Sequence, residues 1–170
     1  MCGNPSPGFE VAKRSSIASG EEKQRAMEAG YTIFDHTADV GLTALGHDPA
    51  EAFSHAARGM FAIILGEDAD GWRGVGSALT LPIEAAGEDW PELLVNWLAE
   101  LIFQFEVHGF VLRKAVFEEC LPPRCRAQVE GIIMDQTEQL HGVGVKAVTY
   151  HQLTVDVGPE RTSLSVIFDI

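Results

Sequence analysis

Several features that define large classes of protein are missing from this sequence of 170 residues. No apolar run approaches the roughly 20 residues that a membrane-spanning helix needs, so we expect no membrane segment. The first residues, from Met1 to Pro5, lack the basic segment followed by an apolar one that marks a secretory signal. We therefore expect a cytoplasmic protein.

Cysteine is scarce, with three residues at positions 2, 120 and 125. An odd number at irregular spacing is not a disulfide framework. Cys120 and Cys125 have no second pair of ligands nearby, which argues against a zinc site. We expect free thiols in a reducing compartment.

Basic residues are few: 12 Lys and Arg stand against 25 Asp and Glu, and the net charge is −13. The basic residues are also scattered, whereas binding to phosphate groups depends on clustered Lys and Arg. We therefore do not expect this chain to bind nucleic acid directly. The acidity suits cation binding or a basic partner surface, although solubility alone also explains it.

Motifs of independent catalysis are missing as well. The sequence has no P-loop, no nucleophile elbow and no His-Glu-x-x-His. The segment Gly142-Val143-Gly144 lacks the third glycine and the following helix of a dinucleotide loop, so we interpret it as a turn. Three histidines have no arranged partners and are expected at the surface: His47, His55 and His141.

The length fits one domain, and a hydrophobic content of 46% is typical of a globular protein. Residues 1–29 hold few apolar anchors and are expected to form a flexible N-terminal arm, with a turn or two of helix in 21–29. Residues 30–170 are expected to form a single domain.

Two helices have clear start signals, in which Asp48 and Asp89 can act as N-caps followed by proline and glutamate. Each then carries an apolar stripe at helical spacing, ending at Gly66 and at Gly109. Alternation predicts strands at 31–34, 40–45, 77–86, 110–119, 125–134, 143–157 and 163–170. Pro82 places its strand at a sheet edge. The order of elements predicts an α+β fold, with two main helices packed on antiparallel or mixed β-sheets.

Two carboxylates and an imidazole lie close together in Asp35-His36-Thr37-Ala38-Asp39, which we expect to form a loop or bulge between strands. Carboxylate oxygens suit hard cations such as Ca²⁺ or Mg²⁺. His36 could instead serve as a general base oriented by either Asp. A turn in which Asp35 or Asp39 binds nearby backbone N–H groups is a third interpretation.

The last strand ends in Asp169, and the carboxylate of Ile170 adds a second negative group one residue away. Adjacent like charges repel, so this end of the strand favours a cation or a basic partner. If Asp39 lies beside it, three oxygen donors converge.

Three residues of the strand expected at 143–157 are candidates for a supporting role, with Asp35 and His36. Alternation places Thr149 and His151 on one face of that strand and Lys146 on the other. A Thr facing the core and a solvent-exposed Lys are the simpler interpretations of two of them.

These segments together resemble the archease family. The resemblance is carried by 31–42 around Asp-His-Thr-Ala-Asp, the two helices, the strand Val145-Lys-Ala-Val-Thr-Tyr-His151 and the final Ile167-Phe-Asp-Ile170. It covers about residues 31–170 in order, and it implies an archease-like fold.

The resemblance implies an accessory protein rather than an enzyme. Archeases assist the GTP-dependent tRNA-splicing ligase of the RtcB type by promoting its guanylylation and multiple turnover. The family binds a divalent cation, which could be Ca²⁺, Mg²⁺ or Mn²⁺. Its ligands correspond to Asp39, Asp169 and Ile170 in this sequence. Two alternatives stay open: a stand-alone metal-dependent phosphoester hydrolase with His36 as base, and an acidic chaperone or adaptor without metal.

Overall fold

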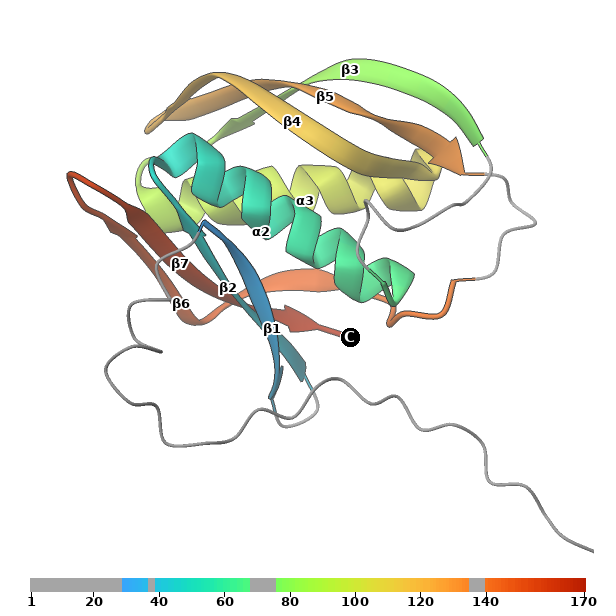
Figure 1. Cartoon of the computed structure of the whole chain (residues 1–170), viewed down its shortest axis with the longest axis horizontal. Coiled ribbons are helices and arrows are strands. Elements are labelled where there is room, and N and C mark those ends of the chain that lie inside the picture. Colours follow the sequence, from blue (N-terminus) through green and yellow to red (C-terminus); the bar gives the residue numbers. More distant parts are fainter. Residues whose placement is uncertain (1–28, 37–38, 68–75, 135–139) are drawn as a thin grey trace, which may run out of the picture.

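The computed structural model describes residues 29–36, 39–67, 76–134 and 140–170. Their helices and strands are β1 (Gly30–His36), β2 (Asp39–Gly46), α2 (Pro49–Leu65), β3 (Gly76–Ala86), α3 (Trp90–His108), β4 (Phe110–Leu121), β5 (Arg124–Met134), β6 (Ala147–Val157) and β7 (Thr162–Asp169). They form three layers, with the helices between two sheets (Figure 1). The expected N-terminal arm lies outside the described residues, apart from Ala29.

Both sheets are antiparallel throughout. Sheet A has the strand order β1-β2-β7-β6, and sheet B has the order β3-β5-β4. The predicted α+β class, with helices packed on antiparallel sheets, is confirmed. Pro82 lies in β3, at an edge of sheet B as predicted.

Both helices begin at the predicted caps. The Asp48 side chain accepts a hydrogen bond from the Glu51 amide at 2.8 Å, and the Asp89 side chain accepts one from the Glu92 amide at 2.9 Å. The Glu51 side chain in turn accepts a hydrogen bond from the amide of His47. The side chains of Asp48 and Glu51 therefore satisfy N–H donors on both sides of the helix start. Gly66 and Gly109 end the helices in the left-handed conformation.

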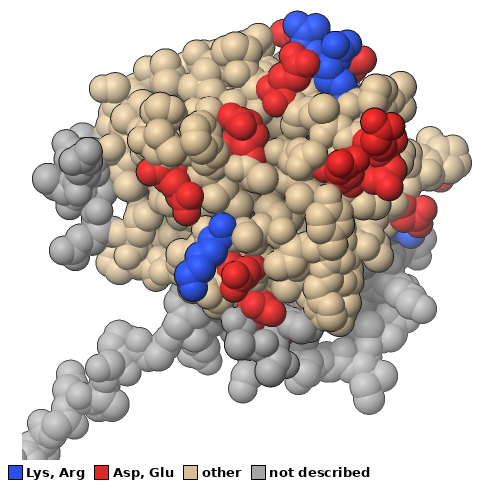
Figure 2. All heavy atoms as spheres, turned by 180° about the vertical axis from the view of Figure 1, so that it is seen from behind, with Lys and Arg blue, Asp and Glu red and all other residues tan. Residues whose placement is uncertain are grey.

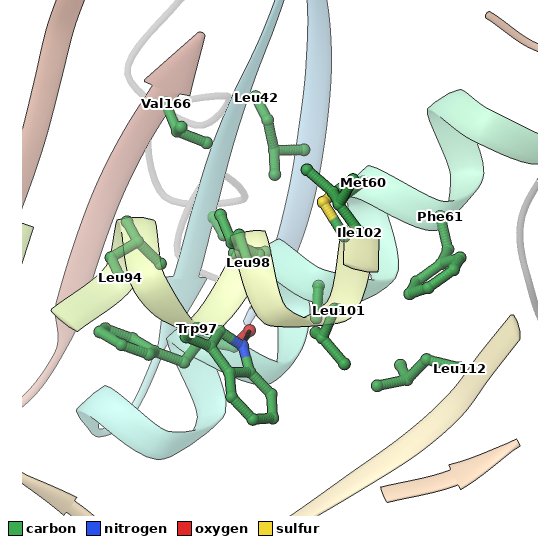
Figure 3. Packing of buried hydrophobic residues seen from close by; sticks show 14 of the residues in the cluster. Leu42, Met60, Phe61, Leu94, Trp97, Leu98, Leu101, Ile102, Leu112 and Val166 are labelled. Atoms are coloured by element: carbon green, nitrogen blue, oxygen red, sulfur yellow. Dashed lines mark hydrogen bonds between the residues drawn. The ribbon is translucent and has the colours of Figure 1, made fainter. Parts of the chain in front are cut away.

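The core lies on both sides of the helical layer. Side chains of α2 and α3 meet Leu42 and Val166 from sheet A and Leu112 from sheet B (Figure 3). The Trp97 indole is fully buried and donates a hydrogen bond to the Phe53 carbonyl at 3.3 Å. The apolar stripe predicted for α2 is buried, but so are several residues outside it, because a helix between two sheets buries more than one face.

Two expectations about the strands need correction. β1 continues through Asp35 and His36, and β2 begins at Asp39, so these three residues belong to paired strands rather than to a loop or bulge. Thr37 and Ala38 lie outside the described residues.

The strand predicted at 143–157 begins only at Ala147, and its alternation is interrupted. The pairing of β6 with β7 shifts between Thr149 and Thr154, where Gln152 has a φ of 51°. The extra residues in β6 reverse which of its alternate side chains lie on the core face of the sheet. Val148 therefore packs against the core before the shift, and Leu153 packs against it after the shift.

Cys120 and Cys125 are free thiols on the paired strands β4 and β5. Burial raises the pKa of the Cys120 thiol to about 12 and that of the Cys125 thiol to about 11. Cys2 lies outside the described residues. Neither described helix is both long enough and apolar enough to cross a membrane.

Candidate cation site

The register of sheet A brings the two ends of the domain sequence together. β2 and β7 are antiparallel, with Val40 opposite Phe168. One residue further along each strand, Asp39 begins β2 and Asp169 ends β7, so the same register continued by one residue would set Asp39 opposite Asp169. Directly opposite residues carry their side chains on the same face, with Cβ atoms about 5 Å apart.

Ile170 follows Asp169 and contributes a main-chain oxygen. Lys146, just before β6, binds this end of β7 twice. Its amide donates to the Asp169 carbonyl at 2.8 Å, and its Nζ donates to the Ile170 oxygen at 2.9 Å. The Lys146 ammonium therefore places a positive charge beside the Ile170 oxygen, which offsets part of the negative charge at this end of β7.

Asp35 is separated from this group by the alternation of β1. It pairs with Val40, which packs against the core, and therefore shares the face of Val40. Asp39 and Asp169 lie on the opposite face of sheet A, because neighbouring residues of a strand point to opposite faces. The structure thus distinguishes two carboxylates that are only four positions apart in the sequence.

His36 ends β1 and pairs with Asp39, so its backbone lies next to the site. Thr149 pairs with Ile167, and its hydroxyl donates a hydrogen bond to the Ile167 carbonyl at 3.0 Å. Thr149 therefore helps to hold β6 against β7, two residues before Asp169.

His151 is exposed and lies within the shifted part of β6, where its Nε2 is 3.2 Å from the side-chain Nε2 of Gln152. The simple alternation that placed His151 on the face of Thr149 is interrupted here. Of the five supporting candidates, Lys146 binds the predicted ligand set directly, Thr149 binds the strand that carries it, and Asp35 lies on the other face.

The donor set suits a hard divalent cation. Among the described residues, no three side chains of His, Cys, Asp or Glu gather closely enough to hold a metal ion. The candidate site has two such side chains, Asp39 and Asp169, and the Ile170 oxygen supplies the third group. All three are oxygen donors, which Ca²⁺ and Mg²⁺ prefer. Their assignment as ligands stays a prediction.

Sequence reasoning missed a pocket of about 510 Å³ at the other end of β2, lined in part by His47, Asp156 and Arg161. These residues are distant in the sequence, so no local motif indicated it. His47 also has a partner after all, since its Nδ1 lies 2.7 Å from Glu51. His55 is half-buried, with its Nδ1 2.6 Å from the Leu45 carbonyl.

The charge of the surface agrees with the composition. Figure 2 shows one face, on which carboxylates are scattered over a largely uncharged surface and the basic side chains form no continuous stripe. Within the described residues of this face, nothing resembles the basic track that a nucleic-acid backbone requires.

Comparison with known proteins identifies the family of the chain. Residues 31–170 match the archease protein family (MTH1598/TM1083). A protein archease of Methanosarcina barkeri is 31% identical over 144 residues, covering 82% of this chain and 95% of the relative. A protein archease of Danio rerio is 28% identical over 160 residues, covering 88% of this chain and 94% of the relative.

Solved structures show the same fold. The solution structure of Methanobacterium thermoautotrophicum protein 1598 has a TM-score of 0.63 and 26% identity, covering 83% of this chain and 99% of that one. The crystal structure of an archease from Thermotoga maritima, described as a possible chaperone, has a TM-score of 0.55 and 18% identity, covering 81% and 94%. The family match, the related sequences and the shared fold together show that this chain belongs to the archease family.

Proposed function

We propose that this protein is an accessory factor that holds a divalent cation with Asp39, Asp169 and Ile170 and activates a GTP-dependent RNA ligase of the RtcB type. In this proposal it promotes guanylylation and multiple turnover of the ligase during tRNA splicing. It contributes a binding surface and a charged site, and the chemical steps occur on the ligase.

One observation carries the proposal. Val40 pairs with Phe168, and this register continued by one residue would bring the carboxylates of Asp39 and Asp169, from opposite ends of the domain, next to each other at the end of sheet A. Two carboxylates on directly opposite residues, with Cβ atoms about 5 Å apart, repel each other and destabilise the folded chain unless another group compensates their charge. A cost of this kind at an exposed strand end favours a functional role over a structural one.

The residues around the site have distinct roles in this proposal. Asp39 and Asp169 supply anionic oxygens, and Ile170 supplies a main-chain oxygen. Lys146 holds the Ile170 oxygen at 2.9 Å and limits the repulsion while no cation is bound. Thr149 fixes β6 against β7, which sets the position of the last residues. A bound cation would supply charge neutralisation near the phosphates of the partner's nucleotide.

The surface charge supports a protein partner that holds the RNA. With a net charge of −13, the chain is poorly suited to bind a polyanion by itself. The description of the Thermotoga maritima relative as a possible chaperone also favours an accessory role over independent catalysis.

The test is a guanylylation assay with an RtcB-type ligase, GTP and divalent metal, with and without this protein. We expect stimulation by the wild type and its loss in Asp39→Ala and in Asp169→Ala. Asp35→Ala is the matched control, because that carboxylate lies on the other face of the same hairpin. Full stimulation by both site variants would contradict the metal assignment.

A second arm tests the hydrolase alternative. Turnover of a phosphoester by this protein alone, lost in His36→Ala, would contradict the accessory role. Stimulation that persists after removal of all divalent metal bound to this protein would instead support a chaperone without metal.

A further inference from the structure

Within the described residues, the two sheets have four edges, formed by β1 and β6 in sheet A and by β3 and β4 in sheet B. An edge strand exposes unpaired N–H and C=O groups that can pair with a strand of another chain. Proteins protect such edges with proline, with charged residues, or with bulges that break the regular hydrogen-bonding pattern.

Three of the four edges carry such protection. β3 contains Pro82. β4 has two register shifts along its pairing with β5 and carries charged residues such as Lys114. β6 has the shift between Thr149 and Thr154, with Gln152 at a φ of 51°.

β1 has neither a proline nor a register shift. Its sequence, GYTIFDH, carries one acidic residue, Asp35, near its end and no lysine or arginine. It pairs with β2 in one unbroken register over all seven residues. Residues 32–35 are exposed in succession, so both faces of the strand reach solvent there. Figure 1 shows β1 at the margin of sheet A, next to β2.

Two apolar side chains of β1 are also partly exposed. Ile33 is 36% exposed and Phe34 is 37% exposed. The Phe34 ring lies over Gly41 on β2, where a side chain at Gly41 would collide with it. The glycine thus lets the aromatic ring lie flat across the neighbouring strand, which orders an exposed apolar group before any partner binds.

We propose that the outer edge of β1 is the docking surface for an extended segment of the partner protein, which adds to sheet A as a further strand. Main-chain hydrogen bonds would supply affinity, and Ile33 and Phe34 would contact alternate side chains of the segment. The proposal rests on the proposed function, since it describes how that partner is held.

The negative charge near the end of β1 determines which kind of partner segment binds along this strand. β1 runs toward the candidate cation site, because His36 pairs with Asp39. Asp39 lies on the adjacent strand β2, and Asp169 lies on β7, the strand after it. The docked segment is therefore apolar along most of its length and carries Lys or Arg at the end that lies near these carboxylates.

A second copy of this chain fits less well. Two β1 strands paired in antiparallel fashion about Ile33 would bring together two surfaces of the same acidic protein, each with a net charge of −13. A basic partner segment meets no such repulsion.

The test combines binding, exchange and a matched pair of variants. In Ile33→Lys a charge is placed on the outer edge of β1, whereas Leu79→Lys places the same charge on an edge strand of the other sheet at a similar exposure of 40%. We expect ligase binding to weaken by about tenfold or more in Ile33→Lys and to stay within about twofold in Leu79→Lys.

Hydrogen exchange on the wild-type complex gives an answer that needs no variant. Amides of residues 30–36 should gain protection when the RtcB-type ligase binds, because the outward N–H groups of β1 become hydrogen-bonded. Unchanged exchange in this segment would overturn the inference even if Ile33→Lys failed to fold. A dimer of the protein alone that Ile33→Lys dissociates would overturn it in favour of a second copy.

The two proposals fail in different ways. If Ile33→Lys binds and stimulates the ligase like the wild type while Asp169→Ala does not stimulate, the edge inference is wrong and the proposed function stands. If the wild type neither binds nor stimulates the ligase, both are wrong.

Discussion

Replacing Asp169 with Asn removes one negative charge from the candidate cation site with little change in side-chain volume. Asp169 and Asp39 each lie one residue beyond the Phe168–Val40 pair, so the register of sheet A continued by one residue would set them opposite each other. At a separation of about 5 Å, two unit charges repel by about 0.8 kcal/mol in the dielectric of water. Without divalent cation, we therefore expect Asp169→Asn to melt about 2 °C higher than the wild type.

Calcium should reverse this order. The attraction between one carboxylate and a divalent cation at about 2.4 Å is about 3.5 kcal/mol in the dielectric of water. Because the Asn amide oxygen keeps part of this attraction, we expect Asp169→Asn to bind about 100-fold more weakly. At a calcium concentration 100 times the wild-type Kd, binding stabilises the wild type by about 2.7 kcal/mol. The variant, then near its own Kd, gains about 0.4 kcal/mol.

The assay is thermal unfolding after treatment with chelator, followed by titration with calcium, magnesium or manganese. Asp35→Asn is the control, because it removes the same charge from the other face of the hairpin. It should keep the wild-type response to cation. Equal cation-induced shifts in Asp169→Asn and the wild type would refute the reasoning, as would a loss of response in Asp35→Asn as large as that in Asp169→Asn.

Four further predictions concern single groups. Lys146→Met should raise calcium affinity several-fold in calorimetry, because the ammonium group no longer competes for the main-chain oxygen that it binds; unchanged affinity would contradict this competition. Trp97→Ala should cost about 3–5 kcal/mol in urea unfolding, since the indole is fully buried; a cost near zero would contradict the packing. In the native protein at pH 8, iodoacetamide should leave Cys120 and Cys125 unlabelled in peptide mass spectra, because the raised pKa values of about 12 and 11 keep both thiols protonated, while both label in guanidinium. Hydrogen bonds from His47 lower the pKa of Glu51. The stability difference between the wild type and Glu51→Gln should therefore be present at pH 7 and disappear as the pH falls through that lowered pKa; a pH-independent difference would argue against it.

Local features of the sequence determined the ends of the helices and much of the core. Asp48 and Asp89 start the helices through contacts with residues three positions away, so their signals are complete within a few residues of sequence. Pro82 marked its edge strand because a proline cannot donate a hydrogen bond on either side, whatever strand lies beside it.

Alternation alone could not locate the position in β6 at which the side chains change from one face of the sheet to the other. The shift between Thr149 and Thr154 exists because β6 pairs with β7 on both sides of it, and the sequence of β6 looks regular. For the same reason, the position of His151 relative to Thr149 could not be read from their spacing.

The candidate site shows most clearly which features the sequence determined and which only the tertiary structure determined. The sequence by itself supplied the carboxylates at the two ends of the domain, and the resemblance indicated Asp39 rather than Asp35. Only the pairing of β2 with β7 brings together the strand ends that carry Asp39 and Asp169, and only the pairing of Asp35 with Val40 turns Asp35 to the other face. Pairing between strands so distant in the sequence depends on the shared core beneath them, which no local pattern of residues encodes.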